Sequence, residues 1–293
     1  LSVFNDNGYG LPSASSGNSN IDGNNYVAWN FGKSAGYFDV IKQTIPDTNP
    51  ITVQHNLGTK PGFIIGRPIN SSSAWWCWHN ALSQTEYIYL NENGPALDAT
   101  INIYYDVEDT QFKCNLGQMT VQGEYIFYVF AEDTPGVIKC GLSPVSVQEA
   151  TEVGFEPQWV LLKPQQQTGN WIICDNKRSD GSGQTAALYP DDNRLEDAYD
   201  YITFNSTGFT NNYADNCIYV AIAVPPTRSQ TNEEFVETTA KFLTYDNRKQ
   251  VKQGEEAQAE RNELEDALIK KGLSKDLIKA AFGSAKKTPK AKK

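Results

Sequence analysis

The chain contains 293 residues, and its 35 acidic side chains outnumber its 25 Lys and Arg to give a formal net charge of −10. This surplus of negative charge argues against a nucleic-acid partner, because affinity for phosphate backbones depends on clustered positive charge. Hydrophobic residues make up 39% and charged residues 20% of the sequence, which is typical of a folded globular chain. The sequence contains no run of about 18 apolar residues, which argues against a membrane-spanning helix and a membrane partner.

The N-terminal region, residues 1–35, is predicted to be the second half of a β repeat whose first half is missing. It contains a polar turn at residues 5–9 and then the apolar run Tyr26-Val-Ala-Trp-Asn-Phe31. The same order, a turn followed by an apolar run, closes both of the complete units that follow. The chain begins with Leu1 and has neither a basic nor an apolar leader pattern, so we expect a processed or truncated product.

Two complete repeat units are predicted at residues 36–132 and 133–226. The second unit repeats the motifs of the first in the same order and at a constant spacing. The matched segments are Gly58-Thr-Lys-Pro61 with Gly154-Phe-Glu-Pro157, and Trp75-Trp-Cys-Trp-His-Asn80 with Trp171-Ile-Ile-Cys-Asp-Asn176. Matched Gly, Pro, Trp and Asn positions in one order indicate a tandem duplication.

The repeat units are predicted to be antiparallel β-sandwiches. Their apolar segments are short, rich in β-branched and aromatic residues, and bounded by Gly, Pro, Asn and Asp, which is the pattern of strands and turns. The turn signals recur at the short intervals that are typical of an antiparallel sandwich. The predicted fold class is therefore all-β, with tandem antiparallel, jelly-roll-like β-sandwich repeats followed by an α-helical C-terminal tail.

The C-terminal region, residues 227–293, is predicted to be that helical tail. Thr231 and Glu234 have the spacing of a capping box, and Gly272 marks the end of a later helix. The apolar residues expected to contact another protein or copies of the same tail are Phe235, Val236, Phe242, Leu243, Leu264 and Leu268. We interpret the tail as an assembly element with a disordered basic end at residues 286–293.

The run Trp75-Trp-Cys-Trp-His79 is the most conspicuous candidate site. In a strand, Trp75 and His79 share one face, and the two middle tryptophans share the other. Trp75 recurs as Trp171 in the second unit, which favours a packing role for both indoles. The alternative is an exposed aromatic platform that stacks on sugar rings, with Trp75, His79 and Trp171 as glycan or receptor contacts.

No other pattern favours a catalytic, cofactor or metal site. The five cysteines are single and widely spaced, unlike those of zinc fingers, and are interpreted as buried free thiols. The segment 175–181 is rich in oxygen ligands, but Lys177 and Arg178 interrupt it, so a hydrogen-bonded turn is favoured over a calcium loop. His55 and His79 are interpreted as structural or surface histidines, because no nucleophile motif of the Gly-x-Ser-x-Gly type accompanies them. The scattered carboxylates are interpreted as solvated surface rather than as a glycosidase pair.

An ordered set of motifs extends through about residues 1–226. The set comprises Tyr26–Phe31, Gly36–Asp39, His55–Gly58, Pro61–Ile65, Gly154–Lys163, Asp175 with Arg178, and Tyr219–Ile222. It resembles a repeat found in tail-fibre and other virion proteins of marine tailed phages. The resemblance implies a module without an assigned reaction that occurs in long appendage proteins. The first unit has His79 and Leu82 where the second has Asp175 and Arg178, so the resemblance implies no shared ligand site.

We therefore predict a non-enzymatic structural protein of a phage virion, part of a tail fibre or a similar host-attachment appendage. Tandem modules extend a protein and repeat one surface, and phage appendages of this kind are usually homotrimers that gain avidity from several weak contacts. The predicted partners are copies of the chain, other virion proteins and a host-surface glycan. The predicted location is the virion, assembled in the host cytoplasm. The alternatives are a stand-alone carbohydrate-binding module or adhesin, and a polysaccharide-degrading enzyme of the host-recognition apparatus.

Overall fold

The computed structural model describes residues 3–5, 8–10, 26–46, 50–115, 122–144, 149–179, 185–213 and 215–223. The secondary-structure elements in these residues are all β-strands, and every pairing between them is antiparallel. The chain divides into one compact unit, Leu1–Ala223, and a second unit, Val224–Lys293. The predicted tail helices lie outside the described residues, as do the assembly residues Phe235, Val236, Phe242, Leu243, Leu264 and Leu268.

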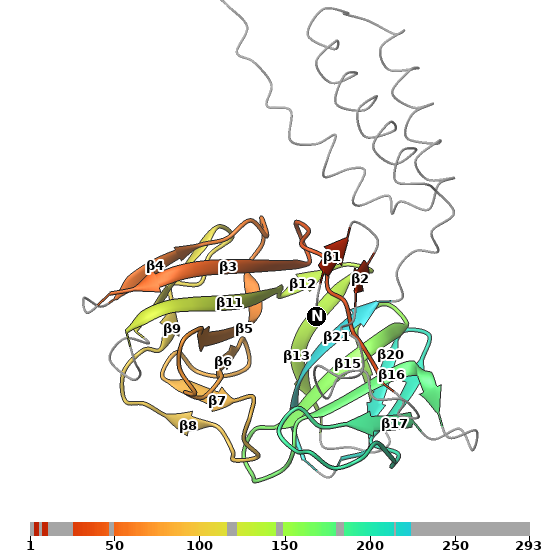
Figure 1. Ribbon diagram of the computed structural model, residues 1–293. Helices are drawn as coiled ribbons and strands as arrows, with labels where there is room; N and C mark the ends of the chain where they lie inside the picture. Colours follow the sequence, from red (N-terminus) through yellow and green to blue (C-terminus); the bar gives the residue numbers. More distant parts are fainter. Residues whose placement is uncertain are drawn as a thin grey trace, which may run out of the picture. The chain divides into compact units, whose positions relative to one another are not determined.

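The first module, strands β3–β11, contains two antiparallel sheets (Figure 1). Its larger sheet has the strand order β3-β11-β5-β6-β7-β8, and its smaller sheet has the order β4-β10-β9. The bounds are β3 (Phe38–Ile45), β4 (Ile51–Gln54), β5 (Pro61–Pro68), β6 (Trp76–His79), β7 (Glu86–Tyr89), β8 (Leu97–Asp98), β9 (Tyr104–Tyr105), β10 (Gln111–Cys114) and β11 (Gly123–Ala131). Phe112 on the smaller sheet lies 5.6 Å, between ring centroids, from Phe127 on the larger, so the two sheets pack face to face.

The second module, strands β12–β21, has the same arrangement. Its larger sheet has the order β12-β13-β21-β15-β16-β17-β18, and its smaller sheet has the order β14-β20-β19. The bounds are β12 (Asp133–Thr134), β13 (Ile138–Ser143), β14 (Ala150–Glu152), β15 (Pro157–Pro164), β16 (Ile172–Ser179), β17 (Thr185–Leu188), β18 (Asp197–Ala198), β19 (Ile202–Asn205), β20 (Gly208–Asn211) and β21 (Cys217–Ala223). Apart from the short edge strand β12, each strand therefore has a counterpart at the same place in the first module.

Matching turns lead into matching strands. Gly58 and Gly154 have φ angles of 69° and 84°, a region that glycine adopts more readily than any other residue. Each of these glycines precedes a strand that begins at a proline, β5 or β15, as the Gly-x-x-Pro motif predicts. A proline at the first position of a strand fixes φ where the hydrogen-bonded ladder begins.

Strand pairing corrects one detail of the sequence alignment. In the sequence, the apolar runs that close the two units are Tyr125–Phe130 and Tyr219–Val224, which makes Tyr219 the expected counterpart of Tyr125. In the sheets, however, Tyr125 pairs with Pro68 and Cys217 pairs with the equivalent Pro164, so Cys217 is the counterpart of Tyr125. A shift of two residues keeps every side chain on the same face of a strand, so the apolar pattern alone could not reveal it.

The N-terminal residues contribute a hairpin and an irregular segment. In the hairpin of β1 (Val3–Asn5) and β2 (Gly8–Gly10), Asn5 pairs with Gly8, just as Asn205 pairs with Gly208 between β19 and β20. The apolar run 26–31 has no strand structure. Its last residue, Phe31, packs against aromatic rings of both modules, Phe130 and Trp159, at centroid distances of 5.7 and 5.3 Å.

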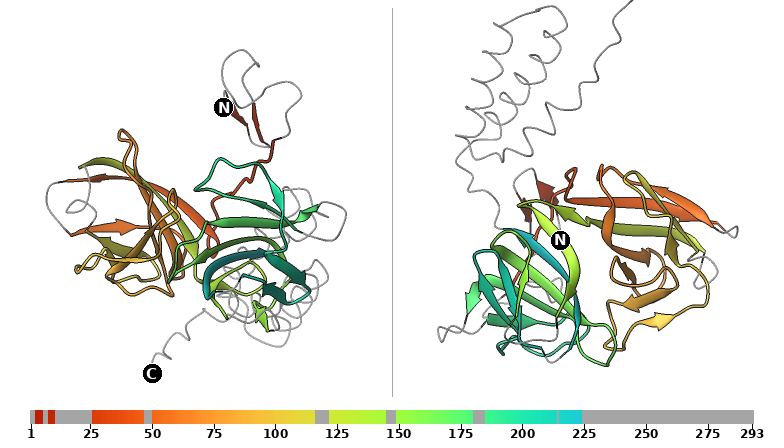
Figure 2. Two further views of the ribbon diagram at one scale, coloured as in Figure 1. Left: turned by 90° about the horizontal axis from the view of Figure 1, so that it is seen from below. Right: turned by 180° about the vertical axis from the view of Figure 1, so that it is seen from behind.

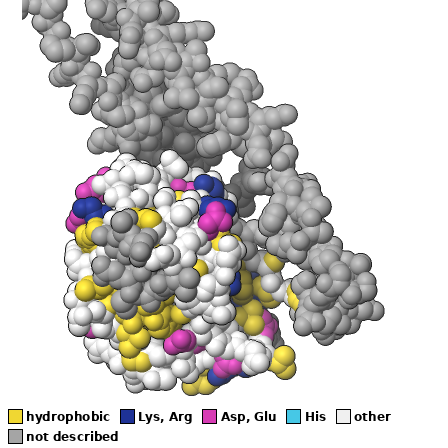
Figure 3. All heavy atoms as spheres, turned by 60° about the vertical axis from the view of Figure 1, so that its left-hand side comes forward, with side chains coloured by type: hydrophobic (Ala, Val, Ile, Leu, Met, Phe, Trp, Pro, Cys, Tyr) yellow, Lys and Arg dark blue, Asp and Glu magenta, His cyan; other side chains and the backbone are white. Residues whose placement is uncertain are grey.

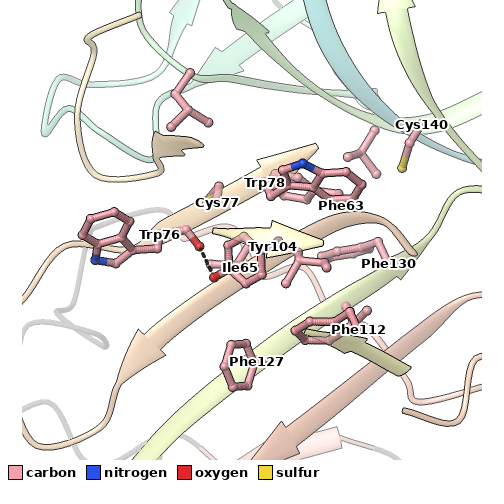
Figure 4. Packing of buried hydrophobic residues seen from close by; sticks show 14 of the residues in the cluster. Phe63, Ile65, Trp76, Cys77, Trp78, Tyr104, Phe112, Phe127, Phe130 and Cys140 are labelled. Atoms are coloured by element: carbon pink, nitrogen blue, oxygen red, sulfur yellow. Dashed lines mark hydrogen bonds between the residues drawn. The ribbon is translucent and has the colours of Figure 1, made fainter. Parts of the chain in front are cut away.

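The larger sheets of the two modules face each other and share one core. Along β15, Trp159 and Leu161 belong to the hydrophobic cluster of the first module, whereas Val160 and Leu162 belong to the cluster inside the second. Figure 2 shows the two modules side by side. Figure 4 shows the aromatic packing of the shared cluster, including the hydrogen bond from the Tyr104 hydroxyl to the Trp76 carbonyl (3.2 Å). The alternation along β15 places each larger sheet between its own smaller sheet and the other module.

Candidate functional site

The three residues predicted to contact a glycan do not form one surface. Trp171 is 1% exposed, and its Nε1 donates a hydrogen bond to the Tyr89 carbonyl of the other module at 2.8 Å. His79 is also 1% exposed. Only Trp75 remains half-buried. Burial therefore removes His79 and Trp171 from the predicted glycan contact, and Trp171 has the packing role that its recurrence favours.

Trp75, directly before β6 in the first module, lies close to a cation and to an aromatic ring. The Arg67 guanidinium carbon is 4.5 Å from the indole centroid, within the range of a cation–π interaction. The Tyr128 ring is tilted from the indole by only 10°, at a centroid distance of 6.4 Å. A sugar that stacked on the face under Arg67 would have to displace the guanidinium. This arrangement disfavours the sugar platform predicted for Trp75.

His79 forms a direct link between the modules. Its Nε2 lies 2.9 Å from the Tyr219 carbonyl oxygen, and its Nδ1 lies 3.1 Å from the Ala81 backbone nitrogen. Because a carbonyl accepts and a backbone N–H donates, the ring is neutral and carries its proton on Nε2. Burial lowers the pKa of His79 to about 4. The side chain is thus a fixed structural donor, which favours the structural over the surface interpretation of His79.

The loop between β7 and β8 of the first module, residues 89–96, binds the second module at residues 163–171. The Gly169 backbone N–H donates to the Asn93 carbonyl at 2.9 Å, and the Ala96 N–H donates to the Gln165 carbonyl at 2.8 Å. Together with the bond from Trp171 to Tyr89, these contacts fix the loop along the edge of the second module. We call this contact the seam.

Lys163 adds a buried cation to the seam. Its side chain is fully buried, and Nζ donates to the Asn93 carbonyl at 3.0 Å and to the Gly169 carbonyl. Burial lowers the pKa of Lys163 to about 8, since removal from water disfavours the charged form. Lys163 is not among the predicted site residues. Its signal is a cation within an apolar strand, repeated as Arg67 in the first module.

Asp175 and Arg178 form a second polar cluster, on the second module. The Asp175 carboxylate accepts from the Lys177 and Arg178 backbone N–H groups at 3.0 Å each and from Arg178 Nε at 2.6 Å. Arg178 also pairs with Glu196, and Trp29 Nε1 lies 3.4 Å from Asp175. Burial opposes ionisation, but the donors outweigh it and lower the pKa of Asp175. The predicted hydrogen-bonded turn is therefore a bulged end of β16. There the Asp175 carboxylate is already paired with Arg178.

The other chemically reactive side chains are enclosed. All five cysteines are free and buried, as predicted, and burial raises the pKa of Cys174 and Cys217 to about 12. His55 is 4% exposed, and burial lowers its pKa. In the part of the chain that the structure describes, no cluster of His, Cys, Asp and Glu has the arrangement of a metal site. A search of the same residues finds no helix of the length and apolarity that crossing a membrane requires.

In the residues that the structure describes, the fold and the seam define an all-β unit built from two modules of one strand order with a shared core. The chain belongs to the family described as a domain of unknown function, DUF7483, whose model matches residues 1–223. Those residues coincide with the compact unit Leu1–Ala223. Neither the curated proteins nor the solved structures contain a match to the chain.

Proposed function

We propose that this chain is a non-enzymatic structural protein of a phage virion, part of a tail fibre or a similar host-attachment appendage. The observation that carries the proposal is that one module docks on the next, through the hydrogen bonds of the seam and through the shared hydrophobic core. Modules joined in this way form a continuous structure and repeat one surface along it. The resemblance of the motifs to marine phage appendage proteins supports the virion role.

The positions of the reactive side chains support a structural rather than a catalytic role. A general base must reach its substrate's proton, and a nucleophilic cysteine needs a lowered pKa and access to solvent. His79 instead uses both ring nitrogens in buried hydrogen bonds, to the Tyr219 carbonyl of the second module and the Ala81 N–H of its own. The cysteines are buried, and the pKa values of Cys174 and Cys217 are raised.

The finer organisation belongs to the same proposal. We infer two jelly-roll-like sandwiches, residues 36–132 and 133–226, preceded by an incomplete copy at 1–35 and followed by a helical tail at 227–293. The equal registers of the hairpins at Asn5–Gly8 and Asn205–Gly208 support the incomplete copy. The tail would join three copies of the chain or bind another virion protein.

Immunogold labelling of purified phage particles with antibodies against residues 1–223 tests this proposal. Labelling along a tail fibre or another appendage is the expected result. Particles that contain no copies of the chain by mass spectrometry would refute the virion role. Release of soluble sugars from host polysaccharide by the purified chain would instead identify an enzyme.

A further inference from the structure

The seam uses only one of two equivalent pairs of surfaces. Loop 89–96 of the first module binds residues 163–171 of the second. The second module has the counterpart of that loop at residues 189–196, and the first module has the counterpart of that face at residues 67–75. We call these the free loop and the free face.

One hydrogen bond establishes the equivalence of the two loops. The Trp75 backbone N–H donates to Asn91 Oδ1 at 2.9 Å, and the Trp171 backbone N–H donates to Asp191 Oδ1 at 3.1 Å. Each loop is therefore held in the same place on its own module, by the first residue of the same tryptophan-containing segment. The loops also share an asparagine at the position that binds the cation in the seam, Asn93 and Asn193.

The free face lacks the cover that its counterpart has. Lys163 is 0% and Trp171 1% exposed in the seam, whereas Arg67 and Trp75 are half-buried, and Ile69 is 41% exposed. Arg67 Nε is itself buried and has no acceptor among the described residues. An unmet buried donor is unfavourable. This donor is on the residue that corresponds to Lys163, which does find a carbonyl in the seam.

The free loop has properties complementary to this face. Leu195 is 88% exposed, the largest value among the exposed large hydrophobic residues of the described chain. Its counterpart in the seam, Pro95, is half-buried. The loop carries three carboxylates and one guanidinium, whereas the only charged residue in 67–75 is Arg67. Figure 3 shows hydrophobic side chains gathered in a patch on one face of the unit, with charged side chains scattered around it.

We propose that the free face of one chain binds the free loop of a second copy of this chain, repeating the seam between molecules. Arg67 then donates to the Asn193 carbonyl, as Lys163 does to Asn93, and Trp75 Nε1 donates to the Tyr189 carbonyl. Leu195 and Ile69, which are both exposed in the single chain, pack against each other in this contact. The inference stands on the seam within the chain and does not require the virion role.

This contact is head-to-tail, because each chain contributes its face to one neighbour and its loop to another. Contacts of this type leave one face and one loop unused at the two ends of any open assembly. Further copies can then add without a change in the contact. Self-association should accordingly depend on concentration and require both surfaces.

Sedimentation velocity of the full-length chain over a range of concentrations tests the inference. The average mass of the wild-type species in solution should rise with protein concentration. Arg67→Glu, which disables the face, and Leu195→Asp, which disables the loop, should each weaken this association by about tenfold or more. An equimolar mixture of the two variants should recover association that neither shows alone, because one intact face then meets one intact loop.

Two matched variants control for the changes in charge and polarity. Lys60 and Leu142 are exposed outside both surfaces, so Lys60→Glu and Leu142→Asp should associate as the wild type does. Urea-unfolding midpoints close to wild type show that each variant folds. A wild-type mass independent of concentration overturns the inference, as does association that survives both variants. Glycan binding that is lost in Arg67→Glu, without self-association, would assign the face to a glycan instead.

Discussion

Acid should weaken the contact between the two modules through His79. In the folded chain the neutral ring donates from Nε2 to Tyr219 and accepts at Nδ1 from Ala81. A proton added to Nδ1 would face the Ala81 N–H, and the charged ring would have no contact with water. Burial accordingly lowers the pKa of His79 from 6.5 to about 4.

The sign and size of the effect follow from proton linkage. The unfolded chain takes up a proton at the ordinary pKa, whereas the folded chain does so only near the lowered value. The contribution of His79 is therefore complete above about pH 6.5 and is lost as the pH falls toward about 4. Between about pH 7.5 and about pH 4.5, the loss amounts to about 2.5 kcal/mol of unfolding free energy.

Urea unfolding of the wild type and of His79→Gln at these two pH values measures the loss. Glutamine keeps an amide donor and an acceptor but does not titrate. Other groups titrate in both proteins and cancel in the comparison, so the stability of the wild type should fall by about 2.5 kcal/mol more than that of the variant. The chain has only two histidines, so a nuclear magnetic resonance titration can follow the ring directly.

His55 provides the matched control. Its Nε2 contacts the Glu108 carbonyl and its Nδ1 the Leu57 N–H, all within the first module. His55→Gln should therefore leave the pH response that is due to His79 intact. Equal pH dependence in wild type and His79→Gln would refute the reasoning, as would a His79 ring that titrates near 6.5 in the folded chain.

Three further predictions concern packing, thiols and the N-terminal segment. Gly62→Ala would place a Cβ 2.6 Å from Glu132 Cα and 2.7 Å from Cys140 Cβ, so urea unfolding should show a loss of about 2–3 kcal/mol; Gly32→Ala, with nothing within 4 Å, should be nearly neutral. The five buried thiols should react with a thiol reagent such as dithionitrobenzoate only after denaturation. Arg178→Gln removes the ring contact with Trp29 and two ion pairs, so hydrogen exchange should accelerate around residue 29 and not around residue 79.

The repeat and the strands were predictable because their signals are local. A glycine at positive φ followed by a proline marks the start of β5 and of β15, and short runs of β-branched and aromatic residues between turns mark strands. Motifs that recur in the same order and at a constant spacing then predict which segments of the two repeat units correspond. The alignment was wrong at Tyr219, where a shift of two residues leaves the apolar pattern unchanged.

The seam could not be predicted in the same way. A sequence pattern tells which residues avoid water, but it does not tell whether their cover comes from the same module or from the next. Trp75 and Trp171 occupy equivalent positions, yet one is half-buried and the other is 1% exposed. The difference arises because loop 89–96 covers only the second of them.

This difference in burial between equivalent positions also accounts for the difference between the two cations next to them, Lys163 and Arg67. In the covered copy the cation is Lys163, whose ammonium group donates to two carbonyl groups. In the open copy it is Arg67, whose flat guanidinium can rest on the Trp75 ring while that face is uncovered. If the free face binds a second chain, Arg67 must leave the indole for a carbonyl oxygen. Arg67→Lys should then preserve self-association, because lysine makes this contact in the seam, whereas Arg67→Met should weaken it in sedimentation velocity. Equal association of these two variants would show that the cation at this position contributes nothing to the contact.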